Sequence, residues 1–211
     1  MDFNPEAISA KDVYKLMTGC VVPRPIAWVS TVDENGIPNL APFSYFTPVC
    51  SKPPTLLFCP AVRGTDGQQK DTLNNIRATG EFVVNVVTES LVEAMNTTAT
   101  ELPAEVNEFE LAGVTAAPSA LVRPPRVAES PVQFECRLNQ IVTISDQKGG
   151  GNIVIGTVVH IHVDDSIWRE GNYIDLEAYR PVGRMMGSTY TRITELFTVD
   201  RPPSEVKPKS E

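Results

Sequence analysis

The chain has 211 residues, of which 42% are hydrophobic and 21% are charged. This is enough for one well-filled core, and the 18 prolines indicate interrupted strands and few long helices. The formal net charge of −8 argues against a general nucleic-acid binder, which needs a basic surface for phosphates. This net charge is compatible with an anionic ligand, because a few local hydrogen-bond donors can outweigh the electrostatic field of distant charges.

Cysteine usage and the N-terminus bear on the cellular compartment. The four cysteines are scattered and form no C-x-x-C pair, so neither a zinc site nor a disulfide framework is indicated. The N-terminal stretch is acidic and polar, whereas a signal peptide would be basic and then apolar. No apolar run approaches the length of a membrane span. We therefore expect a soluble, cytoplasmic protein without a membrane partner.

The first third of the chain is typical of a short helix followed by β structure. Ser9 is the expected cap of that helix, and Gly19 is its expected end. The turn signal at residues 33–36 is typical of a hairpin. Pro42 cannot donate to a ladder, which places its strand at an edge or a bulge. The predicted strands lie at residues 26–32, 39–47 and 55–59.

The middle third alternates between helices and one dense apolar strand. Asp71 is predicted to cap a helix that Gly80 ends, and Ser90 with Glu93 forms a capping box for the next helix. Residues 98–131 are punctuated by proline and should be mostly loop. The predicted elements are a strand at residues 82–87 and helices at 72–79, 90–96 and 108–112.

Two long strand-like runs dominate the last third. They cover residues 134–144 and 153–163, and a period-two pattern places one set of apolar side chains on a single face of the second run: Ile153, Ile155, Val159, Ile161 and Val163. Many short strands with turn punctuation predict a mainly β fold, as a closed or partly closed barrel with a few peripheral short helices. Residues 1–200 would form one domain and residues 201–211 a disordered tail.

The strand at residues 39–47 has features that suit a flat, largely apolar ring such as a flavin. Pro42 leaves backbone groups of this strand unpaired, and the small Ala41 lets a ring approach the backbone. Phe43 and Tyr45 share one face of the strand, while Ser44 faces the other way. An ordinary hairpin with aromatic core residues explains the same pattern, so this interpretation stays open.

A second segment suits a phosphate. The helix that starts near Thr72 presents free backbone N–H groups and the positive end of its dipole. Lys70 and Thr72 flank this terminus, Arg63 reaches it from a glycine-containing loop, and Asp71 is explained as the cap. The alternative is a capped helix with solvated basic neighbours.

His160 and His162 lie two residues apart on one strand face, with Asp164 following them. A metal site needs more than two ligands, and no third group has convincing spacing, so a metal is not predicted. A histidine near a flavin, as a hydrogen-bond or proton partner, is the more plausible use.

In combination, several segments resemble the flavin reductase-like family, which has the FMN-binding split-barrel fold and includes flavoredoxin. The likeness covers nearly the whole chain to about Phe197 and keeps the order and spacing of the motifs. The segments are PRPIAWVST, the DENG turn, NLAPFSYF, RGTDGQQKDTLNNI, GEFVVNVV, VNEFELAG, RVAESPVQFEC and YRPVGRMMGSTYTR.

The resemblance implies a homodimer of six-stranded barrels, with each FMN near the subunit interface. Ser30 and Thr31 would lie at the flavin, and Gly187 and Tyr190 would close over its ring. The residues implied to line the isoalloxazine are Ala41, Pro42, Phe43, Ser44 and Tyr45, and those implied to hold the phosphate are Arg63, Lys70, Asp71 and Thr72.

The function implied is hydride transfer from NADH or NADPH, as a transient substrate, onto FMN, whose N5 atom is the reactive centre. No side chain is expected to act as an acid or a base. The chain contains no dinucleotide fingerprint, which fits a nicotinamide that docks transiently. Two alternatives stay open: an FMN-bearing electron carrier that serves a protein partner, and a flavin- or haem-binding module for storage or sensing.

Overall fold

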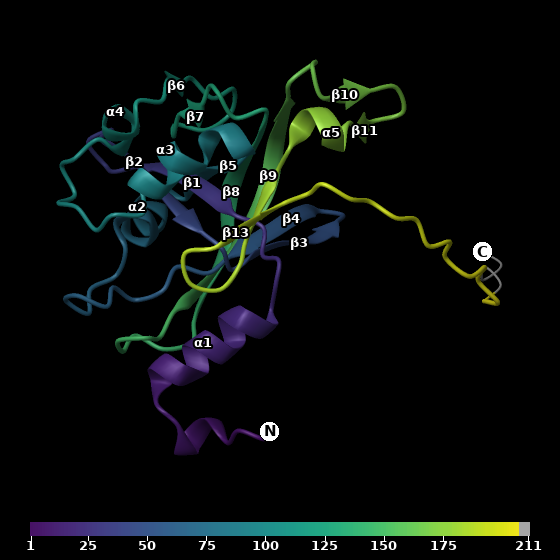
Figure 1. Cartoon of the computed structure of the whole chain (residues 1–211). Coiled ribbons are helices and arrows are strands. Elements are labelled where there is room, and N and C mark those ends of the chain that lie inside the picture. The colour runs from purple at the N-terminus through teal and green to yellow at the C-terminus, as the bar shows by residue number, and fades with distance from the viewer. Residues whose placement is uncertain (207–211) are drawn as a thin grey trace.

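A seven-stranded antiparallel sheet dominates the computed structural model, which describes residues 1–206 (Figure 1). Its strand order is β2-β1-β5-β8-β9-β4-β3. The bounds are β1 (Ala27–Val32), β2 (Pro38–Phe43), β3 (Phe46–Ser51), β4 (Pro54–Phe58), β5 (Glu81–Val86), β8 (Val132–Thr143) and β9 (Asn152–Val163). The fold is therefore mainly β, as the sequence predicts.

Short elements surround this sheet. Three two-stranded ladders pair β6 (Ala116–Ala117) with β7 (Arg126–Val127), β10 (Trp168–Arg169) with β11 (Tyr173–Ile174), and β12 (Val182–Arg184) with β13 (Tyr190–Arg192). The helices are α1 (Ala10–Cys20), α2 (Asp71–Thr79), α3 (Val92–Thr97), α4 (Glu108–Ala112) and α5 (Leu176–Tyr179), with single 3₁₀ turns η1 (Pro5–Ala7) and η2 (Glu89–Leu91). Within residues 1–206, no helix is both long enough and apolar enough to cross a membrane.

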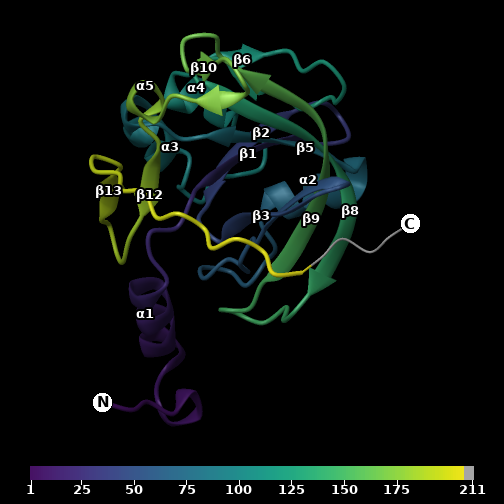
Figure 2. The ribbon, with the colours of Figure 1, turned by 90° about the vertical axis from the view of Figure 1, so that its right-hand side faces the viewer.

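The sheet is strongly curled (Figure 2). In a flat sheet of seven strands the two edges would be about 29 Å apart, at about 4.8 Å per strand. Here only Ser44 and Tyr45 connect the two edge strands, β2 and β3, and an extended chain covers at most about 3.6 Å per residue. The edges must therefore approach each other, although no ladder pairs β2 with β3 among the described residues. The single strand predicted at 39–47 is wrong, because the chain changes edge there.

The core lies on both sides of β1, whose six residues are all buried. Ala27 and Val29 join a cluster inside the curl, whereas Trp28 faces a second cluster under α3 and α4. The Trp28 indole donates to the Thr98 hydroxyl at 2.8 Å. Burial on both faces fits the apolar start of this strand at residues 27–29, and pairing with β1 fixes the position of the neighbouring edge strand β2.

The long strands β8 and β9 are not regular throughout. Their register shifts between Glu135 and Cys136 and again between Leu138 and Gln140. Val158 and Ile161 are three residues apart and would face opposite sides of a regular strand. Because of the register shift, they line the same groove. The prediction of one continuous apolar face along 153–163 is therefore wrong, because a bulge interrupts the period of two.

Two predicted helix caps do not form. Lys70 is the N-cap of α2 and Asp71 is its first residue, with no side-chain capping bond. Ser90 lies in η2, and its hydroxyl bonds the Thr88 hydroxyl at 3.1 Å rather than an α-helix terminus. Gly80 does end α2, with the positive φ of 71° that favours glycine.

The two ends of the chain extend away from the body (Figure 1). Ser9 caps α1 as predicted, but the helix continues past Gly19. After β13 the chain runs without regular structure through residue 206. The tail predicted at 201–211 falls partly outside the described residues, and its disorder stays a prediction.

Candidate functional site

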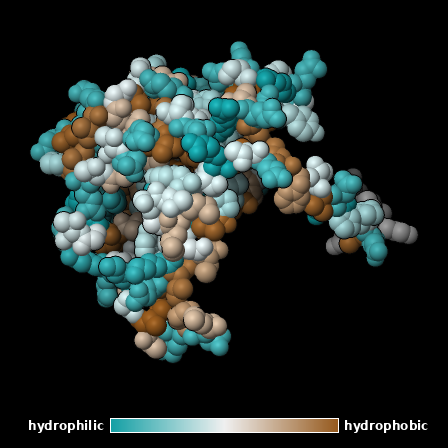
Figure 3. Space-filling view, in the orientation of Figure 1, coloured by the Kyte–Doolittle hydropathy of each residue, from teal (hydrophilic) through white to brown (hydrophobic). Residues whose placement is uncertain are grey.

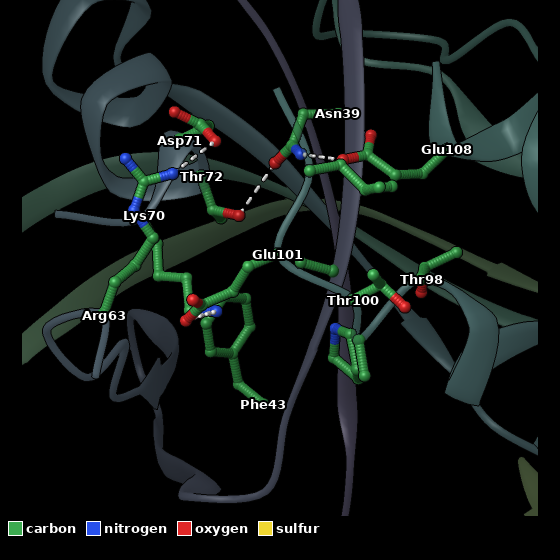
Figure 4. A pocket seen from close by; sticks show the side chains of 14 residues that line it. Asn39, Phe43, Arg63, Lys70, Asp71, Thr72, Thr98, Thr100, Glu101 and Glu108 are labelled. Atoms are coloured by element: carbon green, nitrogen blue, oxygen red, sulfur yellow. Dashed lines mark hydrogen bonds and ion pairs between the residues drawn. The ribbon is translucent and has the colours of Figure 1, made fainter. Parts of the chain in front are cut away.

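A cavity of about 70 Å³ opens between the start of α2, the edge strand β2 and the loop after α3 (Figure 4). Leu73 and Ile76 of α2 pack into the core inside the curl, which holds the helix terminus against β2. The lining residues are Asn39, Ala41, Pro42, Phe43, Arg63, Lys70, Asp71, Thr72, Thr98, Ala99, Thr100, Glu101, Leu102 and Glu108. We call this space the α2 cavity.

The start of α2 offers backbone donors to this cavity. Among residues 1–206 no side chain caps the helix, so the N–H groups of Asp71 and Thr72 have no side-chain capping partner, whereas the Leu73 N–H donates to the Lys70 carbonyl at 2.9 Å. The helix dipole adds partial positive charge at the same place. An anionic group of a ligand would be stabilised here.

Arg63 lies beside this terminus. Its guanidinium is 3.2 Å from an Asp66 oxygen and 3.6 Å from an Asp71 oxygen. Its Nε atom is buried and has no hydrogen-bond partner within residues 1–206. A buried donor left unpaired costs about 1–3 kcal/mol, so the site is chemically complete only with a further acceptor. A phosphate oxygen fits that requirement.

Lys70 and Glu101 face each other across the cavity mouth. The Lys70 ammonium is 3.4 Å from one Glu101 oxygen, and the Thr65 hydroxyl donates to the other at 2.5 Å. The hydrogen bond from Thr65, together with the nearby Lys70 charge, lowers the pKa of Glu101. Glu101 is therefore an anion held against Lys70, one of the two cations that line the cavity.

Glu108 forms the back of the cavity and is buried. Its carboxylate accepts from the Asn39 amide at 2.9 Å and from the Leu40 N–H at 3.1 Å. The Asn39 oxygen in turn accepts from the Thr72 hydroxyl at 2.8 Å. Burial raises the pKa of Glu108. These bonds tie β2, α2 and α4 together, so Glu108 and Asn39 position the cavity wall.

A second cavity, of about 180 Å³, shares Pro42 and Ala99 with the first. We call it the arginine cavity, because two arginines and no carboxylate line it. Its lining residues are Tyr14, Arg24, Ile26, Pro42, Ser44, Met95, Ala99, Arg184, Met185, Gly187 and Tyr190. The two cavities therefore adjoin at the proline-interrupted edge strand.

Arg24 is the buried cation of the arginine cavity. Its guanidinium donates to the carbonyl oxygens of Thr18, Val21 and Met185, at 2.6, 2.9 and 2.9 Å. These bonds tie the end of α1 to the segment between β12 and β13. All three partners are neutral, and within residues 1–206 no ion pair compensates the charge.

Arg184 and Tyr190 form the outer wall of this cavity. The guanidinium carbon of Arg184 lies 4.5 Å from the centre of the Tyr190 ring, and the guanidinium also donates to the Tyr190 hydroxyl and the Gly187 carbonyl. This wall is apolar and aromatic with a cationic edge, which suits a flat ring with polar edges.

The structure brings most of the sequence-predicted residues to this pair of cavities. Ala41, Pro42 and Phe43 line the α2 cavity with the four residues predicted to hold the phosphate, and Ser44 lines the arginine cavity with Gly187 and Tyr190. Three predicted residues line neither: Ser30, Thr31 and Tyr45.

Those three residues have other contacts. The Ser30 hydroxyl donates to the Pro125 carbonyl, and the Thr31 hydroxyl accepts from the Asn75 amide at 3.0 Å. Both side chains are fully buried, whereas Tyr45 is 39% exposed. Their contact with a ligand stays a prediction.

Four charged residues that line the two cavities are missing from the sequence prediction: Arg24, Glu101, Glu108 and Arg184. Glu101 meets partners 31 and 36 positions away, so no local pattern reveals it. Arg24, Glu108 and Arg184 lie inside the segments that carry the family resemblance, which is the signal that could have singled them out.

The two histidines that share one strand face, His160 and His162, are not arranged like the ligands of a metal site. His162 contacts the buried carboxylate of Glu135 at 2.6 Å, and the His160 and His162 rings are 4.5 Å apart. The described residues contain no group of three or more His, Cys, Asp or Glu side chains that could hold a metal ion. Neither histidine lines the two cavities described above.

Comparison with known proteins shows the family to which the chain is similar. Residues 18–182 match the flavin reductase like domain. A protein of Halalkalibacterium halodurans is 42% identical over 204 residues, covering 96% of this chain and 97% of the relative.

Two solved structures are also similar. Nitrilotriacetate monooxygenase component B from Bacillus cereus has a TM-score of 0.89 at 35% identity, covering 94% of this chain and 98% of that one. The 2-nitrobenzoate 2-nitroreductase NbaA from Pseudomonas fluorescens has a TM-score of 0.86 at 29% identity, covering 97% of this chain and 100% of that one. The matched residues 18–182 include every residue that lines the α2 cavity.

Proposed function

Since the chain belongs to the flavin reductase-like family, we propose that it is an FMN-binding oxidoreductase that takes hydride from NADH or NADPH. The observation that carries this proposal is the pair of adjoining cavities. One offers a helix terminus and cations, and the other offers an apolar, aromatic wall. A flavin mononucleotide has the same two parts, a phosphate and a flat ring.

The residues divide the binding between them. Arg63, Lys70, Thr72 and the first N–H groups of α2 would hold the phosphate, and the buried Nε of Arg63 supports this assignment. A single phosphate site favours FMN as the flavin. When bound, the FMN supplies the hydride-accepting chemistry.

The other cavity would hold the ring. Ala41, Pro42 and Ser44 would border it from the strand side and Tyr190 from the outside. Pro42 leaves this edge of the sheet without a ladder partner, so a ring can approach the backbone. No side chain is assigned as an acid or a base, because the protein's contribution is to position the ring and to exclude water.

We further propose that two copies form a homodimer of split barrels. An apolar groove of about 510 Å³ on the curled sheet is lined by residues that include Phe46, Leu56 and Ile161. Tyr14 and Met17 of α1 are exposed on a helix that projects from the body, and Figure 3 shows apolar residues on this projecting part. A second copy would cover both surfaces.

The homodimer can be tested by light scattering coupled to gel filtration. We expect the molar mass of two chains, and we expect Met17→Glu to shift it towards one chain. A mass of one chain for the unaltered protein would contradict this part of the proposal. A cytoplasmic location is also proposed, because all four cysteines are free thiols.

The reductase function can be tested by anaerobic titration. The purified protein with one equivalent of FMN is mixed under argon with NADH, and separately with NADPH, while flavin absorbance is recorded. Bleaching by at least one nicotinamide, faster than for FMN alone, is the expected result. If the protein binds FMN but neither nicotinamide bleaches it, the electron-carrier alternative replaces the reductase.

A further inference from the structure

The carboxylate of Glu101 occupies the place where a ligand's anion would meet Lys70. Its two oxygens contact the Lys70 ammonium at 3.4 Å and the Thr65 hydroxyl at 2.5 Å (Figure 4 shows the contact with Lys70). Both partners are cationic or hydrogen-donating groups of the kind that bind a phosphate oxygen. Glu101 therefore mimics an anionic ligand from within the chain.

A carboxylate and a phosphate cannot share this position. Both are anions that only accept hydrogen bonds from the Lys70 ammonium, and two anions held close to each other repel. The cavity lining already contains three carboxylates, from Asp71, Glu101 and Glu108, against the two cations Arg63 and Lys70. A doubly charged phosphate adds to this excess unless one carboxylate leaves.

Glu101 is the carboxylate that is free to leave. Asp71 is fixed by its place in the first turn of α2, and Glu108 is buried with two hydrogen bonds. Glu101 instead lies in an irregular loop between α3 and α4, with 31% of its side chain exposed. Rotation of its side chain takes the carboxylate into water without disturbing a helix or a strand.

We propose that Glu101 is an internal competitor for the flavin phosphate and that it makes the flavin exchangeable. This inference rests on the proposed function, because it concerns the same cavity. In the free protein Glu101 neutralises Lys70, and a flavin phosphate must displace it. When the flavin leaves, the carboxylate returns and occupies the cation. The competition weakens binding of phosphate-bearing flavins and leaves riboflavin, which has no phosphate, unaffected.

The test compares Glu101→Gln with Glu105→Gln. Glutamine keeps the size of the side chain and an acceptor for Thr65 but removes the charge. Glu105 is an exposed carboxylate of the same loop that has no ion pair among residues 1–206, so its variant removes one charge nearby without touching Lys70. The dissociation constants of FMN and riboflavin are measured by quenching of flavin fluorescence, and the FMN dissociation rate by stopped flow.

Exposed ion pairs contribute little, so the expected change is modest. We expect Glu101→Gln to bind FMN about fivefold more tightly and to release it more slowly, with riboflavin unchanged and Glu105→Gln like the unaltered protein. Unchanged or weaker FMN binding by Glu101→Gln, or an equal gain for riboflavin, would overturn the inference alone. Failure of the unaltered protein to bind either flavin would instead contradict the proposed function.

Discussion

The two adjoining cavities differ in how their positive charges are compensated. In the α2 cavity, Arg63 and Lys70 each have a carboxylate within 4 Å. In the arginine cavity, the hydrogen bonds that Arg24 and Arg184 make within residues 1–206 go to neutral oxygens. The first cavity is therefore neutralised from within the chain, and the second carries an uncompensated positive charge.

The cations of the two cavities therefore have different roles. Arg63 and Lys70 sit in ion pairs, and under the proposed function a ligand's anion would take over these pairs and bind exchangeably. Arg24 is buried among backbone carbonyls that no ligand replaces, so its contribution is first to the fold. Substitutions in the two cavities should therefore affect different measurements.

The largest expected effect concerns the α2 cavity. The double variant Arg63→Ala with Lys70→Ala should weaken FMN binding by at least about a hundredfold, because two charge-assisted hydrogen bonds at about 1.5–3 kcal/mol each are lost. Riboflavin binding should hardly change, since under the proposed function its ring would contact the other cavity. Fluorescence titration of both flavins checks this. Equal losses for FMN and riboflavin would show that the phosphate does not lie at these cations.

The next effect concerns Arg24. The substitution Arg24→Met should lower the free energy of unfolding by about 2–3 kcal/mol, because buried carbonyl oxygens lose their donor. Denaturant unfolding measures it, and Arg184→Met is the matched control in the same cavity. Arg184 is half-buried and its guanidinium donates to the neighbouring Tyr190 and Gly187, so a smaller change of about 1 kcal/mol or less is expected. Equal destabilisation by the two variants would remove the distinction between them.

A smaller effect is expected at the aromatic wall. Tyr190→Ala should weaken FMN and riboflavin by the same factor, about fivefold, because aromatic contact with a ring contributes about 1 kcal/mol. The ratio of the two dissociation constants should therefore stay as in the unaltered protein. A loss confined to FMN would place Tyr190 at the phosphate instead of the ring.

The smallest effect concerns Glu108 and pH. Burial raises the pKa of this carboxyl above its ordinary range. A raised folded-state pKa contributes stability that is fully present below the unfolded value and is lost as pH rises through the folded value. The stability of the unaltered protein relative to Glu108→Gln should therefore be greater at about pH 4 than at pH 7. Denaturant unfolding at both pH values checks the sign, and a reversed trend would contradict it.

Local patterns predicted those parts of the fold that depend on local interactions. Residues 26–32, 55–59 and 82–87 alternate or run apolar over the length of a strand, and the structure has β1, β4 and β5 there. The break at Ser44 and Tyr45 was not predictable in this way. It exists because a seven-stranded sheet curls until its two edges approach each other, and that constraint acts over the whole sheet.

In the candidate site, too, local patterns predicted some residues, whereas others depend on tertiary contacts. Arg63, Lys70 and Thr72 stand close together in sequence around one helix terminus, so the chemistry of a helix start identified them. Asp71 was misjudged as a cap, because the charge of Arg63 and not a backbone N–H is its partner in the structure. Glu101 and Glu108 enter from the loop and helix that fold over the cavity, and their roles follow only from tertiary contacts.

The most direct test of the account is the ratio of the dissociation constants of FMN and riboflavin for the unaltered protein. The two ligands share a ring and differ in one phosphate. The account predicts that FMN binds at least about tenfold more tightly at low salt, since the phosphate gains charge-assisted hydrogen bonds at the α2 terminus. Equal affinity for the two flavins, or no binding of either, would contradict it.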